Sequence, residues 1–134
     1  MQYESENEYV KIWVDKGILN GVYKVRDVDL GIAQQCVDFR LERTDFRPFP
    51  CYIEMGSIKT MTKEARDHFA SERGYSGIVA CALLVDSSIN RLIGNFFLRI
   101  SKPKAPTRLF TDKSKAITWV TQFVTAEHQM AHNS

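Results

Sequence analysis

The segment from Ser87 to Asp112 constrains the fold more than any other part of this 134-residue chain. Two serines able to cap a helix precede apolar residues at helical spacing. A loop with Pro103 and Pro106 follows, and then the short β-like run RLFT. Another helical pattern begins directly after Asp112. Because helices and strands alternate in this way, the segment indicates a layered α/β domain.

Strand patterns occur throughout the rest of the chain. Apolar residues alternate with polar ones from residue 9 to 14, and a turn at Gly17 leads to a returning strand at Ile18–Val25, so we expect an opening hairpin. The continuous apolar run Ile78–Val85 predicts a strand buried on both faces of a mainly parallel sheet. Further short strands are predicted at Cys51–Met55 and Arg108–Thr111.

Four helices are expected between these strands. Each has candidate N-caps, because a side-chain oxygen there can accept from the first free backbone amides. The candidates are Asp27 or Asp29, Thr62, Ser87 or Ser88, and Asp112 or Ser114. In the third helix one apolar face is predicted, made of Ile89, Ile93, Phe96, Phe97 and Ile100.

The expected order is ββαβαβαβα, in one α/β domain with a mixed, mostly parallel sheet flanked by about four helices. We place this domain at residues 9–125 and expect flexible ends at 1–8 and 126–134. His128 and His132 belong to the polar terminal segment and do not indicate a metal pair.

Composition narrows the class of protein. The formal net charge of +2 does not favour a nucleic-acid partner. No apolar run approaches the roughly 20 residues that span a bilayer, and the acidic N-terminus does not resemble a signal peptide. Cys36, Cys51 and Cys81 are far apart, which predicts buried free thiols in a cytoplasmic protein with no metal site or cofactor.

Hydroxyl side chains gather between the predicted strand 51–55 and the helix that follows it. Ser57, Thr60 and Thr62 lie where a helix N-terminus favours an anion, and one of them is a candidate for phosphorylation. The alternative is that Thr62 is simply a cap and the other two are loop residues.

Cations gather near the second proline-containing loop. Arg99, Lys102, Lys104 and Arg108, followed by Lys113 and Lys115, are offset only by Asp112. Such a basic loop is suited to an acidic protein, a phosphorylated ligand or lipid headgroups. The alternative is a solvated loop without a partner.

No catalytic residues are predicted. Asp86 precedes two serines, but the segment lacks the G-x-S-x-G elbow and a neighbouring histidine base. An enzyme would require acid–base groups from among Glu54, Glu64, His68 and Asp86 to face a common cleft.

Three blocks of sequence, ARDHFAS (65–71), ALLVDSSINRLIGNFF (82–97) and KPKAPTRLFTDKSKAITWV (102–120), resemble a family of small bacterial SpoIIAA-like proteins, described as STAS/SEC14-domain-like. The resemblance covers about residues 9–124. It implies the mixed sheet and flanking helices of anti-sigma factor antagonists, in which a partner kinase phosphorylates a serine at a helix start. The matching place here is 56–62, where GSIKTMTKEA replaces the antagonists' Asp-Ser-Ser-Gly pattern.

These observations predict a non-enzymatic regulatory or protein-interaction module of STAS-like type. Its partners would be a regulator or kinase-like protein and a second copy of the chain, with neither nucleic acid nor integral membrane association. The alternative is a SEC14-like module that binds a small apolar or lipid-like ligand in a cavity among the helix stripes.

Overall fold

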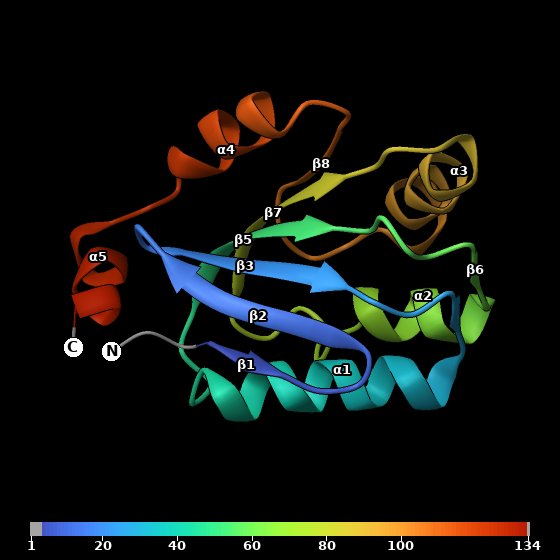
Figure 1. Ribbon diagram of the computed structural model, residues 1–134, viewed down its shortest axis with the longest axis horizontal. Helices are drawn as coiled ribbons and strands as arrows, with labels where there is room; N and C mark the ends of the chain where they lie inside the picture. Colours follow the sequence, from blue (N-terminus) through green and yellow to red (C-terminus); the bar gives the residue numbers. More distant parts are fainter. Residues whose placement is uncertain (1–3, 134) are drawn as a thin grey trace.

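The computed structural model describes residues 4–133 and contains a six-stranded mixed sheet with helices on both faces (Figure 1). The strands of this sheet lie in the order β1-β2-β3-β5-β7-β8, and β4 and β6 form a separate two-stranded sheet. The strands are β1 (Ser5–Glu6), β2 (Val10–Asp15), β3 (Ile18–Tyr23), β4 (Asp27–Val28), β5 (Phe49–Glu54), β6 (Thr60–Met61), β7 (Ile78–Leu84) and β8 (Thr107–Phe110). The helices are α1 (Leu30–Arg43), α2 (Lys63–Ala70), α3 (Ser88–Phe96), the π-helical turn η1 (Phe97–Ser101), α4 (Lys113–Thr121) and α5 (Ala126–Asn133).

The sheet combines an antiparallel hairpin with a parallel half, as predicted. β2 and β3 pair antiparallel through the turn at Gly17, whose φ of +80° suits glycine. The pairs β3–β5, β5–β7 and β7–β8 are all parallel. Pro50 lies inside the central strand β5, where the register with β7 shifts between Phe49 and Pro50. An irregularity of this kind accommodates a residue that has no N–H to donate.

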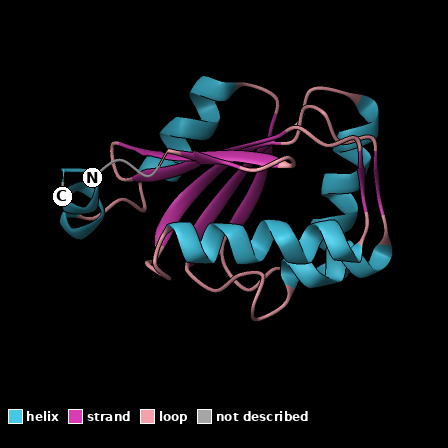
Figure 2. Ribbon diagram, turned by 60° about the horizontal axis from the view of Figure 1, so that its bottom comes forward, coloured by secondary structure: helices cyan, strands magenta, loops and turns pink. Residues whose placement is uncertain are grey.

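The two faces of the sheet carry different helices (Figure 2). Side chains alternate along a strand, so neighbouring residues of β7 belong to different layers. Cys81 and Leu83 pack in the cluster that includes residues of α1, α2 and η1. Ala82 packs with Ala116 and Val120 of α4. The core therefore consists of a larger layer beneath α1 and α2 and a smaller one beneath α4.

Four N-caps predicted from the sequence are confirmed, and the structure decides between the alternatives. Asp29, Thr62, Ser87 and Asp112 each accept a hydrogen bond from the backbone N–H three residues later. At α3 the Asn90 side chain accepts in return from the backbone N–H of Ser87 and completes a capping box.

The third expected helix differs from its prediction. The proposed single apolar face is divided in α3 and η1: Phe97 is buried and Ile93 half-buried, whereas Ile89, Phe96 and Ile100 are exposed. The physical reason is that Asn90 and Gly94 pack inward, and a Cβ on Gly94 would lie 2.8 Å from Leu109 Cδ2. The small residue thus brings α3 close to β8 and turns the larger apolar residues outward.

Both ends that the sequence predicts to be flexible contain secondary structure. Within the predicted flexible N-terminus, β1 pairs with β2. Residues 1–3 and 134 lie outside the described part of the chain. The predicted C-terminal tail contains α5, and His128 is buried with its ring centroid 6.0 Å from that of Phe49. The His132 side chain is outside the described part. Among the described residues no helix is long and apolar enough to cross a membrane.

Candidate functional site

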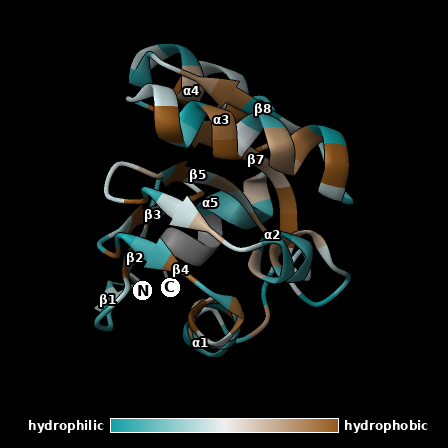
Figure 3. Cartoon of the chain, turned by 90° about the vertical axis from the view of Figure 1, so that its right-hand side faces the viewer, coloured by the Kyte–Doolittle hydropathy of each residue, from teal (hydrophilic) through white to brown (hydrophobic). Residues whose placement is uncertain are grey.

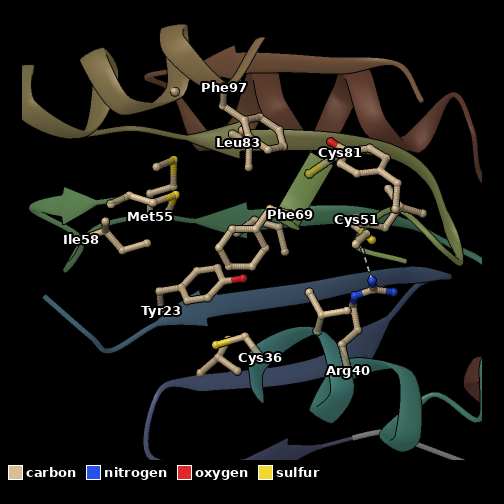
Figure 4. Close-up of a pocket in the computed structure, with 18 of the residues that line it drawn as sticks. Tyr23, Cys36, Arg40, Cys51, Met55, Ile58, Phe69, Cys81, Leu83 and Phe97 are labelled. Atoms are coloured by element: carbon tan, nitrogen blue, oxygen red, sulfur yellow. Dashed lines mark hydrogen bonds between the residues drawn. The ribbon is translucent and has the colours of Figure 1, made fainter. Parts of the chain in front are cut away.

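A cavity of about 100 Å³ lies between the sheet and the layer formed by α1, α2 and α3. Strands β2, β3, β5 and β7 supply one wall through side chains of the same face. The opposite wall comes from α1, α2, α3 and η1. Figure 4 shows the cavity with Met55 and Ile58 at one end and Arg40 and Cys51 towards the other. The cavity therefore belongs to the larger of the two core layers.

The lining is almost entirely apolar. Phe69 of α2 and Phe97 of η1 approach Leu83 of β7 from the helical side (Figure 4). Met55 and Met61 add thioether side chains, which adapt readily to the shape of a neighbour. Such a surface favours an apolar ligand, because it offers water few hydrogen bonds.

Polar groups also line this surface, and the hydroxyl of one of them, Tyr75, is hydrogen-bonded to Thr107 Oγ1 at 2.6 Å. The guanidinium of Arg40 donates from Nη1 to the Ser76 carbonyl at 2.7 Å and from Nη2 to the Gly74 carbonyl at 2.8 Å. Tyr23 packs edge-on against Phe69, with ring centroids 6.1 Å apart, and its hydroxyl points into the cavity (Figure 4). Within residues 4–133 this hydroxyl makes no hydrogen bond.

Burial keeps the thiol and phenol groups of the cavity protonated. It raises the pKa of the Cys36 thiol to about 12 and that of Cys51 to about 11, with the nearby Arg40 charge partly opposing the rise at Cys51. Burial likewise raises the pKa values of Cys81 and Tyr23. All three cysteines are buried and free, as predicted. Protonated thiols are poor nucleophiles and poor metal ligands, and residues 4–133 hold no cluster of potential metal ligands.

The three predicted hydroxyl residues lie near one another at the carboxyl edge of the parallel strands. Thr60 donates its Oγ1 hydrogen to Asp27 Oδ1 at 2.7 Å, and Thr62 caps α2. Ser57 is exposed in the turn before β6. Asp86, which precedes the two serines at the start of α3, lies at the same edge, because a Cβ on Gly56 would be 3.7 Å from Asp86 Oδ2. Phosphorylation at these positions stays a prediction.

The predicted basic loop does not converge on one site. Arg99, Lys102 and Lys104 are exposed on η1 and the loop after it. Arg108 instead lies on the α4 side of the sheet, with its guanidinium carbon 5.1 Å from the Phe110 ring centroid and 5.7 Å from that of Trp119. This stacking holds Arg108 apart from the other three cations.

The candidate acid–base groups do not share a cleft. Glu54 accepts a hydrogen bond from the Tyr52 hydroxyl at 2.8 Å on the face covered by α4. His68 belongs to α2, on the opposite face of the sheet. The absence of catalytic activity stays a prediction, because nothing in this arrangement tests it.

Four large apolar side chains lie on the outer surface of α3 and η1, where Figure 3 shows strongly hydrophobic residues along the helix. We call them the α3 surface stripe: Ile89, Leu92, Phe96 and Ile100, which are 43–59% exposed. Exposed apolar groups at this spacing are typical of a surface that contacts another molecule.

Sequence reasoning missed the role of Arg40. It follows Cys36 by one helical turn on the apolar face of α1, where both line the cavity. A single cation within an apolar helical stripe was the available signal. The sequence carries no local signal for the cavity, because the cavity depends on how side chains from many separate helices and strands fit together.

Residues 12–124 match the family described as "Domain of unknown function (DUF7793)". The chain belongs to this family. A solved structure from Shewanella loihica PV-4, an uncharacterized protein of the DUF3478 family with a SpoIIAA-like fold, is similar to this DUF7793 protein with a TM-score of 0.59. The similarity covers 87% of this chain and 98% of that one at 14% identity. It confirms the predicted SpoIIAA-like fold. No match was found among the curated proteins.

Proposed function

We propose that this DUF7793 protein is a non-enzymatic module that binds a small apolar ligand in the cavity beneath α1, α2 and α3. The cavity is the observation that carries the proposal. Its volume of about 100 Å³ is of the same order as engineered apolar cavities that bind benzene, at roughly 150 Å³. Well-packed cores contain few voids larger than a water molecule, so a void of this size is available to a ligand.

The test uses two neighbouring leucines on β7 that differ in the face to which they contribute. Leu83 lines the cavity, whereas Leu84 packs in the layer beneath α4. In Leu83→Phe the added ring atoms occupy the void, and in Leu84→Phe they do not reach it. The probe is 1-pentanol, titrated into the ¹⁵N-labelled protein and followed by amide chemical shifts.

We expect saturable shifts at cavity residues in the wild-type protein and in Leu84→Phe, and their loss in Leu83→Phe. Shifts that never saturate, or that are equal in all three proteins, would overturn the proposal. Because both variants carry the same substitution, a general effect of a larger residue on β7 is controlled.

A second candidate function is supported by the α3 surface stripe. Arg91, Arg99, Lys102 and Lys104 are exposed on α3, η1 and the loop after it, and residues 87–111 contain no carboxylate side chain. A protein partner with an apolar patch and an acidic rim would complement this surface. A second copy would bring like charges together there, so the stripe does not favour self-association. This candidate function retains the predicted regulatory role, in which phosphorylation near residues 56–62 would switch partner binding.

The stripe is tested by comparing Leu92→Gln with Asn95→Gln, both at exposed positions of α3. An acidic protein captured by wild type and by Asn95→Gln, but not by Leu92→Gln, supports the interaction. Capture that is unaffected by Leu92→Gln argues against it, and sedimentation with anionic vesicles instead would indicate a lipid surface.

Self-association through a surface other than the stripe, and a cytoplasmic location, are proposed separately. A homodimer is tested by light scattering, where a mass of twice 15.4 kDa supports it and a mass of 15.4 kDa refutes it. Three free buried cysteines are consistent with a reducing compartment such as the cytoplasm.

A further inference from the structure

The charge of Arg40 is not neutralised by the protein. Within residues 4–133 no aspartate or glutamate forms an ion pair with it, and nearby Asp38 is paired with Arg73 at 2.7 Å. Its two hydrogen-bond acceptors are the neutral carbonyls of Gly74 and Ser76. A guanidinium has five N–H donors, so donors remain after these two bonds. Arg40 is half-buried, and the part of its charge that faces the apolar cavity attracts an anion more strongly than a fully solvated charge does.

The Tyr23 hydroxyl provides a second donor at the same place. It points towards the part of the cavity that contains Arg40 (Figure 4). The Arg40 charge partly opposes the rise in the pKa of Tyr23 that burial causes, which is consistent with this proximity. A protonated phenol donates a hydrogen bond, and leaving such a group unpaired in an apolar setting costs free energy.

We propose that the ligand is a small apolar carboxylic acid, with its carboxylate bound by Arg40 and Tyr23 and its hydrocarbon tail in the apolar part of the cavity. This inference rests on the proposed function and adds the chemical class of the ligand. The two backbone carbonyls hold the guanidinium in place before binding. Fixing a donor in advance lowers the entropy cost of forming the new bonds.

The volume of the cavity limits the tail. Benzene, with its six carbon atoms, fits a cavity of roughly 150 Å³, so about 100 Å³ has room for about four carbon atoms. Pentanoate, with a four-carbon tail, is the matched probe. Affinity rises about fourfold for each added methylene up to this length and then levels off.

Other ligand chemistries fit less well. A metal ion is disfavoured by the positive charge of Arg40 and by the protonated thiols, since the pKa of Cys51 is raised to about 11 by burial. A neutral hydrocarbon fits the lining but leaves the Tyr23 hydroxyl without a partner. A carboxylate accepts from several donors at once and matches the planar fork of a guanidinium.

The experiment compares pentanoate, 1-pentanol and methyl pentanoate on the wild-type protein, using amide chemical shifts to measure each dissociation constant. We expect pentanoate to bind about ten- to a hundredfold more tightly than the alcohol or the ester, because charge-assisted hydrogen bonds are the strong ones. This comparison changes only the ligand and does not depend on how any variant folds.

Variants then test whether Arg40 and Tyr23 bind the carboxylate. Tyr23→Phe removes a hydroxyl that has no partner in the protein, so we expect unchanged stability and about three- to tenfold weaker pentanoate binding. Arg40→Gln removes the preference for pentanoate over 1-pentanol. Arg43→Gln lies on the same helix but is exposed and outside the cavity, so it leaves the preference unchanged.

The outcomes separate the two proposals. Saturable binding of all three probes with equal affinity overturns the carboxylate inference and leaves apolar ligand binding intact. Saturable binding of none of them overturns the proposed function itself. A preference for pentanoate that Arg43→Gln abolishes and Arg40→Gln does not would refute the assignment of the anchor.

Discussion

Filling the cavity tests whether the void beneath α1 and α2 exists. An enclosed empty cavity costs about 24 cal/mol per Å³, so filling about 100 Å³ raises the free energy of unfolding by at most about 2.4 kcal/mol. Leu83→Phe adds three carbon atoms from β7, which is most of what the cavity can hold. Allowing for imperfect fit, we expect the variant to gain about 1 kcal/mol, corresponding to a melting temperature about 4 °C higher.

The gain is measured by urea unfolding and by calorimetry of the wild type, Leu83→Phe and Leu84→Phe. Leu84 packs against the layer beneath α4, which contains the fully buried Ala116 and Val120. That layer has no cavity for the added atoms, so Leu84→Phe does not raise the free energy of unfolding. A loss of more than about 1 kcal/mol in Leu83→Phe would show that the site is already packed, because overpacking costs about 1–3 kcal/mol.

Three further predictions concern the ends and turns of the chain. Burial lowers the pKa of His128 below 6.5, so the unfolded chain takes up the proton first. The free energy of unfolding therefore falls as the pH drops from 6.5 through the folded-state pKa. His128→Gln flattens this dependence in urea titrations between about pH 5 and 7, and an unchanged slope contradicts the prediction. Gly17→Ala loses more than about 1 kcal/mol, because φ is +80° and the new Cβ would lie 2.7 Å from Val124 Cγ1; equal melting temperatures refute this. Asp112→Ala removes the cap of α4 and costs about 1 kcal/mol, while Ser114→Ala costs nothing; the reverse order would place the cap wrongly.

Local patterns were sufficient to predict the opening hairpin, the parallel strands and the helices α1 to α4. The hairpin at 9–25 followed from alternation and a glycine turn, and the buried strand at 78–85 from an unbroken apolar run. These signals reside in adjacent residues, so they are visible without tertiary information. The same holds for the caps, although only the structure distinguished Asp29 from Asp27.

Long-range packing accounts for what the sequence did not predict. The apolar residues of α3 were expected on one face, but the close approach of Gly94 to Leu109 turns part of them outward. The polar segment 126–133 gave no reason to expect a helix docked through His128. In both cases a contact between residues distant in the chain overrides the local pattern.

The candidate site was likewise predicted only in part from the sequence. A cavity among the helix stripes was one of the two predicted alternatives, whereas its polar anchor was not predicted. Arg40 gains its significance from the carbonyls of Gly74 and Ser76, more than thirty residues away in the sequence. No local motif encodes that arrangement.

The most direct test of the account is a crystal structure of the protein grown with pentanoate. The account predicts electron density for the tail in the cavity beside Leu83 and Phe69, with the carboxylate within about 3.2 Å of the Arg40 guanidinium. Density for protein side chains throughout that volume, with no room for a ligand, would contradict it.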